Sequence, residues 1–258
     1  MAHPQQLMFF SIINEMLGKK KKGMNVLEIG SYDITGSVRQ FFNDCEYTGC
    51  DLTEGPGVDL VCSGHNLNFP ENSYGITLSS ECFEHNPYWT ETFMNMYRMT
   101  KPGGIVLITC ASTGRAEHGT ERTTDKISVS PGTSAIGWDY YKNLTKRDFK
   151  KNLKLDALFD KYFIYYMPTS CDLYFCGQKK GSPIFNFDKD ALLTRMAEIK
   201  SIPIYQNISS TRYLLLKLHS FPIWFMSKVL DDFTFQNARI RYLDSVRPLK
   251  VVINKIFH

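Results

Sequence analysis

The sequence has little that would assign it to a specialised class. Its seven cysteines are scattered without the paired spacing of metal ligands, which favours reduced thiols and predicts a cytoplasmic location. The N-terminal segment lacks the plan of a signal peptide, because its basic run, residues 19–22, follows the apolar stretch instead of preceding it. A net charge of +4 is too small to argue for a nucleic-acid partner by itself. These absences leave an ordinary globular protein, and the 43% hydrophobic and 22% charged composition agrees with that class.

The apolar pattern between residues 25 and 110 predicts an α/β fold. Five short apolar runs, NVLEIG, YTGCDL, DLVCSG, GITLSS and GIVLITC, alternate with two helical patterns, GSVRQFFND and PYWTETFMNMYRMT. Strand and helix in this rhythm indicate a Rossmann-like, doubly wound and mostly parallel sheet. A helix over residues 4–17 precedes the sheet, and YFIYYMPTS and CDLYFCGQKK predict a C-terminal antiparallel hairpin that closes it. Asn86 and Pro87 are expected to begin the second helix.

We expect two domains. Residues 1–181 form the sheet domain, and residues 111–146 within it form a long polar loop at the carboxyl edge of the sheet, where α/β folds bind ligands. Residues 182–258 contain 11 lysines and arginines against 6 acidic residues and form a helical C-terminal extension. The extension is expected to pack on the domain or to support a homo-oligomer, with contact between residues 213–230 and a membrane surface as the alternative. That segment is too interrupted for a membrane span; the interruptions are Lys217, His219 and Pro222.

The loop after the first apolar run, in NVLEIGSYDITGSV, indicates the ligand. A dinucleotide fingerprint needs G-x-G-x-x-G for close approach to a pyrophosphate, and the second and third glycines are missing after Gly30. Glu28 stands near the end of this run, and Asp51 near the end of the second, where a carboxylate can accept hydrogen bonds from ribose hydroxyls. An acidic first turn suits a cation better than a phosphate, which disfavours an NAD-linked oxidoreductase. The ligand should have a ribose and a positive charge but no pyrophosphate, and S-adenosylmethionine meets that description.

Four segments in register resemble the class I S-adenosylmethionine-dependent methyltransferases, the broad group that includes the ubiquinone-biosynthesis type. They are VLEIGSYDITGS for the first motif, YTGCDL for the acidic second motif, FPENSYGITLSSECFEH for the fourth strand, and MYRMTKPGGIVLIT for the helix, turn and fifth strand. The resemblance covers residues 24–180 and implies an enzyme whose cofactor is S-adenosylmethionine.

The resemblance also implies which residues hold the cofactor. Glu28, Gly30 and a helix opening at Gly36 would hold the methionine end, and Asp51 would hold the ribose. Leu52 and the turn CSGHNLNF would close over the adenine, and the end of the fourth strand would face the sulfonium. The candidate cofactor-binding residues are Glu28, Gly30, Ser31, Tyr32, Gly36, Asp51, Leu52, Ser63, Gly64, His65, Ser80 and Glu81.

Methyl transfer to a hydroxyl also needs a base, and histidine is the side chain best tuned for that role near neutral pH. His118 in the polar loop is the first candidate, and His85 and Glu84 directly after the fourth strand are further candidates. Trp138 and Tyr141 in the same loop, among many hydroxyl side chains, suit a sugar or another polyhydroxylated acceptor. No Asp/His cluster along the sequence is distinctive enough to name a metal site. We therefore expect an O-methyltransferase that acts on a sugar, a glycan or another small molecule.

Two other functions stay open. A non-catalytic subunit would bind the cofactor and support a partner through residues 182–258. Methylation of nucleic acid is suggested by HNPYW at residues 85–89, which resembles the motif of adenine-methylating enzymes. That motif has two prolines where this chain has one, and the polar loop lacks the dense basic and aromatic interleaving that grips a strand. A nucleic-acid acceptor is therefore disfavoured.

Overall fold

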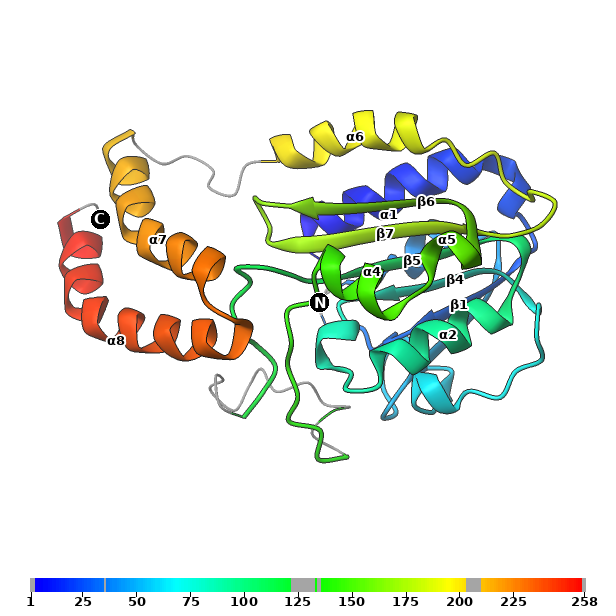
Figure 1. Cartoon of the computed structure of the whole chain (residues 1–258), viewed down its shortest axis with the longest axis horizontal. Helices are drawn as coiled ribbons and strands as arrows, with labels where there is room; N and C mark the ends of the chain where they lie inside the picture. Colours follow the sequence, from blue (N-terminus) through cyan, green and yellow to red (C-terminus); the bar gives the residue numbers. More distant parts are fainter. Residues whose placement is uncertain (1–2, 35, 122–132, 134–135, 203–209, 257–258) are drawn as a thin grey trace.

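A seven-stranded sheet forms the centre of the protein (Figure 1), whose computed structural model describes residues 3–34, 36–121, 133, 136–202 and 210–256. In sheet order the strands are β3 (Leu60–Val61), β2 (Glu46–Asp51), β1 (Asn25–Ile29), β4 (Tyr74–Ser80), β5 (Thr100–Ala111), β7 (Asp172–Lys179) and β6 (Phe159–Met167). The first five are parallel, whereas β7 runs antiparallel to both β5 and β6. The predicted doubly wound sheet with a C-terminal antiparallel hairpin is confirmed.

Helices cover both faces of this sheet. One face packs against α1 (Pro4–Leu17), α6 (Lys189–Ser201) and the 3₁₀ helix η2 (Val38–Phe42), and the other against α2 (Trp89–Met99), α4 (Lys146–Asn152) and α5 (Leu155–Leu158). Because side chains alternate along a strand, β5 serves both cores: Ile105 and Leu107 join the first, and Val106 and Ile108 join the second.

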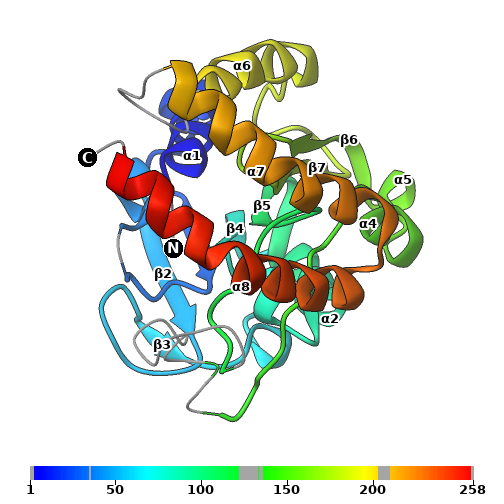
Figure 2. The same ribbon diagram turned by 90° about the vertical axis from the view of Figure 1, so that its left-hand side faces the viewer.

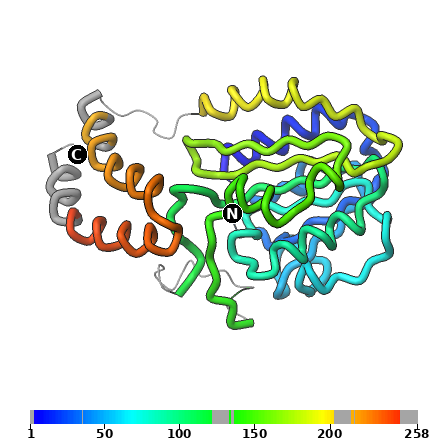
Figure 3. The backbone as a smooth tube through the Cα atoms, viewed as in Figure 1, coloured from blue at the N-terminus to red at the C-terminus, as the bar shows by residue number. Residues whose placement is uncertain are grey.

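Helix α6 belongs to the core of the sheet. Figures 1 and 3 show it lying beside α1, and its buried side chains Leu192, Met196 and Ile199 share one apolar cluster with Phe9 and Phe10 of α1. The predicted division of the chain at residue 181 stays a prediction, and the helix that follows it is packed on the sheet domain.

Helices α7 (Ser210–Val229) and α8 (Asp232–Ile256) pack on each other beside the carboxyl edge of the sheet (Figure 2). The side-chain amide of Gln236 in α8 donates to the Arg115 carbonyl at 2.9 Å and accepts from the Glu117 N–H at 3.0 Å. The Asn143 amide donates to Asp232 at 2.8 Å. These bonds attach the extension to the loop that follows β5.

Helix α7 exposes several large apolar side chains beside Lys217 and Lys228. Its exposed large apolar side chains are Leu214, Leu218, Phe221, Trp224, Phe225 and Val229. No helix in the described part of the chain is long and apolar enough to cross a membrane. Contact of residues 213–230 with a membrane surface stays a prediction, and the side chains of residues 213 and 216 lie outside the described set.

Two local predictions were wrong. The segment after Gly36 forms the five-residue 3₁₀ helix η2 instead of an α-helix that opens at Gly36; it begins after Ser37, whose hydroxyl accepts the Arg39 N–H at 3.1 Å. The second helix, α2, begins at Trp89, because Asn86 instead closes the preceding 3₁₀ turn, η4 (Phe83–His85). The Asn86 side chain accepts the Tyr88 N–H at 2.8 Å, a local bond that competes with a helical cap.

Candidate functional site

A cleft lies at the carboxyl ends of β1 and β4, on either side of the point where the strand order reverses. Open α/β sheets bind ligands at such switch points. The cleft encloses about 870 Å³ of empty space, including its open mouth. Ten of the twelve predicted cofactor-binding residues line it: Glu28, Gly30, Ser31, Tyr32, Gly36, Asp51, Leu52, Gly64, Ser80 and Glu81.

The turn after β1 fits closely against the turn after β4. Gly30 has a φ of +82°, and a Cβ atom built on it would lie 2.4 Å from the Cβ of Cys82. Any side chain at this position would therefore clash with the neighbouring backbone turn as well as strain its own. The Gly30 N–H donates to the Cys50 carbonyl of β2 at 2.9 Å, which fixes the turn over the switch point.

Two carboxyl groups end the central strands. Glu28 is buried and accepts a hydrogen bond of 2.7 Å from the Tyr47 hydroxyl, and burial raises its pKa to about 7. Asp51 accepts the backbone N–H of Tyr32 at 2.9 Å and of Leu52 at 2.7 Å, while burial raises its pKa. Since a carboxylate has about four acceptor positions, Asp51 can still accept two hydroxyl donors from a ligand.

The turn after β3 contributes only part of what was predicted. Gly64 and its neighbour Cys62 line the cleft, whereas Ser63 and His65 do not. The Ser63 hydroxyl accepts the Asn66 amide at 2.9 Å and so serves the 3₁₀ turn η3 (Gly64–Asn66) itself. The His65 ring packs 4.4 Å from the ring of Tyr88 and 6.0 Å from that of Trp138, in an aromatic group beside the cleft mouth.

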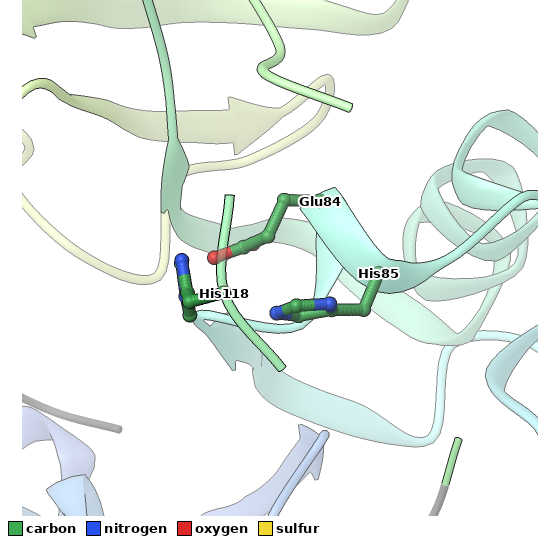
Figure 4. Close-up of side chains that lie close together, drawn as sticks. All are labelled: Glu84, His85 and His118. Atoms are coloured by element: carbon green, nitrogen blue, oxygen red, sulfur yellow. The ribbon is translucent and has the colours of Figure 1, made fainter. Parts of the chain in front are cut away.

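The three candidate catalytic residues lie together (Figure 4). Glu84 and His85 belong to η4, directly after β4, and His118 follows β5. One ligand-type atom from each lies within 4.8 Å of the others, and the two imidazole rings are 5.1 Å apart at 88°. His85 lines the cleft, so the cluster adjoins the cavity at the end of β4.

The surroundings of this cluster change its acid–base behaviour. Burial lowers the pKa of His85 to about 3 and that of His118 to about 4, because the charged imidazolium is desolvated. Burial also raises the pKa of Glu84 well above its ordinary value, with the nearby Glu81 adding to the rise. His118 is therefore neutral at pH 7 and is a weaker base than an ordinary histidine, on which the sequence expectation rested.

Sequence reasoning missed several residues that line the cleft. Cys82 and Asn86 follow β4 and line the cavity wall, and Thr133 reaches it from the polar loop, as does Trp138, which from the sequence was assigned to the acceptor alone. Cys82 could have been found from its place beside Ser80 and Glu81 at a strand end, whereas Asn86 was interpreted only as a helix cap. Within the predicted loop 111–146, residues 122–132, 134 and 135 lie outside the described residues.

The lining fits the expected cofactor. Four carboxylic residues, Glu28, Asp33, Asp51 and Glu81, and no lysine or arginine are among the described residues that line the cleft. This charge pattern favours a cationic nucleoside and opposes a pyrophosphate. The Ser31 hydroxyl is buried and has no hydrogen-bond partner among the described residues, so the cleft offers a polar atom that a ligand can satisfy.

Comparisons with known proteins identify the family of this chain. A family model described as a methyltransferase domain matches residues 1–153. Uncharacterized methyltransferases of Mycobacterium tuberculosis are 40% identical to the chain over 60 residues, which is 23% of this chain and 24% of theirs. The match thus spans about a quarter of the length of these curated relatives.

Solved structures with a similar fold include a Haemonchus contortus phosphoethanolamine N-methyltransferase in complex with S-adenosyl-L-methionine. It is 18% identical, with a TM-score of 0.49, over 67% of this chain and 52% of its own. A Burkholderia thailandensis 1,6-didemethyltoxoflavin-N1-methyltransferase is 17% identical, with a TM-score of 0.47, over 69% of this chain and 80% of its own. The family model covers more than half of the 258 residues, so the chain belongs to the methyltransferase-domain family.

Proposed function

We propose that the protein transfers the methyl group of S-adenosylmethionine to a hydroxyl of a sugar, a glycan or another small hydroxylated molecule. The observation that carries this proposal is the cluster of Glu84, His85 and His118 at the wall of the cofactor cleft. Carboxylate and neutral imidazole groups are those that hold and activate a hydroxyl acceptor. The ubiquinone-biosynthesis subgroup, a cytoplasmic location and a homo-oligomeric assembly belong to the same proposal.

The aromatic group at the cleft mouth supports a sugar-like acceptor. The rings of Trp138 and Tyr88 lie 5.4 Å apart, and Trp138 also lines the cleft. Tyr141 lies 5.3 Å from the His85 ring, and its hydroxyl donates to the Ala116 carbonyl at 3.1 Å. A polyhydroxylated ring has C–H groups on its faces and hydroxyls around its edge. Aromatic rings beside hydrogen-bonding groups can contact both.

The residues of the chain that we assign to the cofactor act by binding and orienting it. Asp51 would accept the ribose hydroxyls, and Glu28 would lie on the side of the positive charge. The cofactor supplies an electrophilic methyl group, and the protein places the acceptor in line with it in a site from which water is excluded.

Calorimetric titration tests the cofactor assignment first. We expect micromolar affinity for S-adenosylhomocysteine and no detectable heat with NAD, because the lining holds four acidic residues and no lysine or arginine among its described positions. Incubation with S-adenosylmethionine and a panel of sugars, polyols and amines then identifies the methylated atom by mass spectrometry. Methylation of an amine alone would refute O-methylation, and tight binding without any turnover would favour the non-catalytic subunit.

The raised pKa of Glu28 predicts a pH-dependent affinity. Below pH 7 the Glu28 carboxyl is protonated in the free protein, and a cationic ligand favours its ionised form, so binding releases a proton. Affinity for S-adenosylmethionine is therefore expected to fall as pH drops from 7 to 5.5, by up to about tenfold per pH unit. Calorimetry across that range measures the slope.

Two variants identify the group responsible. Glu28→Gln should flatten the pH profile, whereas Glu54→Gln, at an exposed position after β2, should leave it unchanged. A Glu28→Gln variant with the wild-type slope would mean that another group sets the pH dependence.

A further inference from the structure

The cluster of Glu84, His85 and His118 contains a buried carboxyl group without a cationic partner. Glu84 has 0% exposure, and among the described residues only two backbone N–H groups, its own and that of Ala111, approach its carboxyl group, with no side-chain donor or cation in hydrogen-bond contact. Burying a charged carboxylate without a hydrogen-bond donor or a cation costs several kcal/mol of folding free energy. A cost of that size is a large part of the net stability of a folded domain. Figure 4 shows its carboxyl group directed between the two histidine rings. The position of the Glu84 carboxyl group is therefore suitable for contact with a cation.

A neighbouring cluster shows how the protein compensates buried carboxylates elsewhere. Glu81 and Asp172 lie with His3 in a similar arrangement, with ligand-type atoms within 4.8 Å of one another. The Arg115 guanidinium lies 3.6 Å from Glu81 and 3.5 Å from Asp172, and His3 lies 2.7 Å from Asp172. That cluster therefore has a cation of its own, Arg115. No lysine or arginine among the described residues forms an ion pair with Glu84. The Glu84 cluster therefore lacks the cation that Arg115 gives to Glu81 and Asp172.

Each of the two histidines has a ring nitrogen that is free to bind an ion. The Nδ1 atom of His118 lies 2.9 Å from the Ala116 carbonyl, which can only accept, so Nδ1 carries the proton and Nε2 keeps its lone pair. A ring whose second nitrogen donates to a carbonyl is the usual arrangement of a metal-bound histidine. The His85 Nδ1 atom is buried and has no hydrogen-bond partner among the described residues.

The backbone also holds the rings in place. Gly119, with a φ of +71°, lies so close to His85 that a Cβ atom there would be 2.9 Å from the ring. The Tyr141 ring lies 5.3 Å from the His85 ring and 5.2 Å from the His118 ring. The ring positions are thus fixed by packing on more than one side.

We propose that Glu84, His85 and His118 bind a divalent transition-metal ion at the wall of the cofactor cleft. Two imidazole nitrogens and one carboxylate suit Zn²⁺, Mn²⁺, Fe²⁺ or Co²⁺ better than Mg²⁺, which prefers oxygen ligands alone. Three protein ligands would leave coordination positions open for an acceptor, and one of the three, His85, lines the cleft.

This inference rests on the proposed hydroxyl acceptor. An oxygen bound to the ion loses its proton to water more easily, since a divalent ion lowers the pKa of a bound hydroxyl. The oxygen lone pair then forms the bond to the methyl carbon, the carbon–sulfur bond breaks, and its electron pair stays on sulfur in S-adenosylhomocysteine. In this arrangement His118 binds the ion instead of taking the proton.

Metal binding tests the proposal without an activity assay. Untagged protein, freed of metal with a chelator, is titrated with Co²⁺ and followed by its visible absorption and by equilibrium dialysis. We expect one equivalent to bind and to raise the melting temperature. Glu84→Gln keeps the shape of the side chain and removes the buried charge, so it should fold and should weaken Co²⁺ binding by about a hundredfold or more. His3→Gln removes a histidine from the neighbouring cluster and should bind as the wild type does.

Each other outcome overturns the proposal. Failure of the wild type to bind Co²⁺, or equal binding by Glu84→Gln, would show that the cluster is not a metal site. Loss of binding in His3→Gln alone would place the ion in the Arg115 cluster. The acceptor panel run on the same samples separates the two proposals: methylation of amines alone refutes the proposed function whether or not Co²⁺ binds, whereas methylation of a hydroxyl by protein that binds no Co²⁺ refutes only the metal site.

Discussion

Replacing Arg115 with leucine is expected to lower the free energy of unfolding by about 3–5 kcal/mol. The Arg115 guanidinium lies between Glu81 and Asp172, at 3.6 Å and 3.5 Å, and the side chains of both acids are almost completely buried. Leucine fills part of the volume but leaves two carboxylates side by side without a cation. Their repulsion adds to the cost of keeping each one out of water.

Urea denaturation of the variant measures this loss. The matched control is Arg39→Leu, since Arg39 pairs with Asp59 at 3.0 Å but both side chains are more than a third exposed. Removal of that exposed pair should cost about 1 kcal/mol or less. If the two variants lost equal stability, the buried ion pairs of Arg115 would contribute no more to the free energy of unfolding than the exposed pair of Arg39. Water would then have to solvate Glu81 and Asp172 in the variant.

Arg115 also connects the site to the extension. Its carbonyl accepts the side-chain amides of Asn143 at 3.0 Å and Gln236 at 2.9 Å, and its guanidinium donates to the Ser170 carbonyl at 3.0 Å. The loop after β5, the β6–β7 turn and α8 therefore meet at one residue. Nothing in the sequence pattern distinguishes Arg115 from the other basic residues of its loop, because its partners come from distant segments.

The sheet and the cofactor cleft could be predicted because their signals are local. Five apolar runs of strand length predict the parallel strands, and Glu28, Gly30 and Asp51 stand at strand ends that must meet at one edge of the sheet. Predictions about single turns were less accurate. Gly36 does not open an α-helix, and Asn86 does not cap α2, because side-chain bonds within each turn compete with the cap that the pattern favours.

Only part of the cluster of Glu84, His85 and His118 could be predicted from the sequence. Glu84 and His85 are adjacent to a predicted strand end, but His118 lies in a loop without any sustained period, and no spacing rule brings it to His85. No metal site was therefore named from the sequence. Burial of the Glu84 carboxyl group with no side-chain donor or cation of the described residues in contact with it is a property of the folded chain alone, and it is the reason for proposing an ion there.

Asp51→Ala is expected to weaken binding of S-adenosylhomocysteine by about tenfold to a hundredfold, the loss of one or two charge-assisted hydrogen bonds. Asp51 ends β2 and lines the cleft, and its two oxygens already fix the Tyr32 and Leu52 N–H groups. Alanine therefore removes the acceptors for the ribose and also loosens the loop that closes over it. Calorimetry measures the affinity, and circular dichroism checks that the variant is folded.

The control is Asp59→Ala, because Asp59 also accepts a backbone N–H, that of Gly49 at 2.7 Å, but is absent from the described lining of the cleft. Its affinity should change less than about twofold, since only contacts with the ligand carry binding energy of the size expected at Asp51. Equal losses in both variants would mean that anchoring of the loops, and not acceptance of the ribose, governs cofactor binding. A folded Asp51→Ala protein with unchanged affinity would remove Asp51 from the site, and the ribose would then have to be held by backbone groups of the turn after β1.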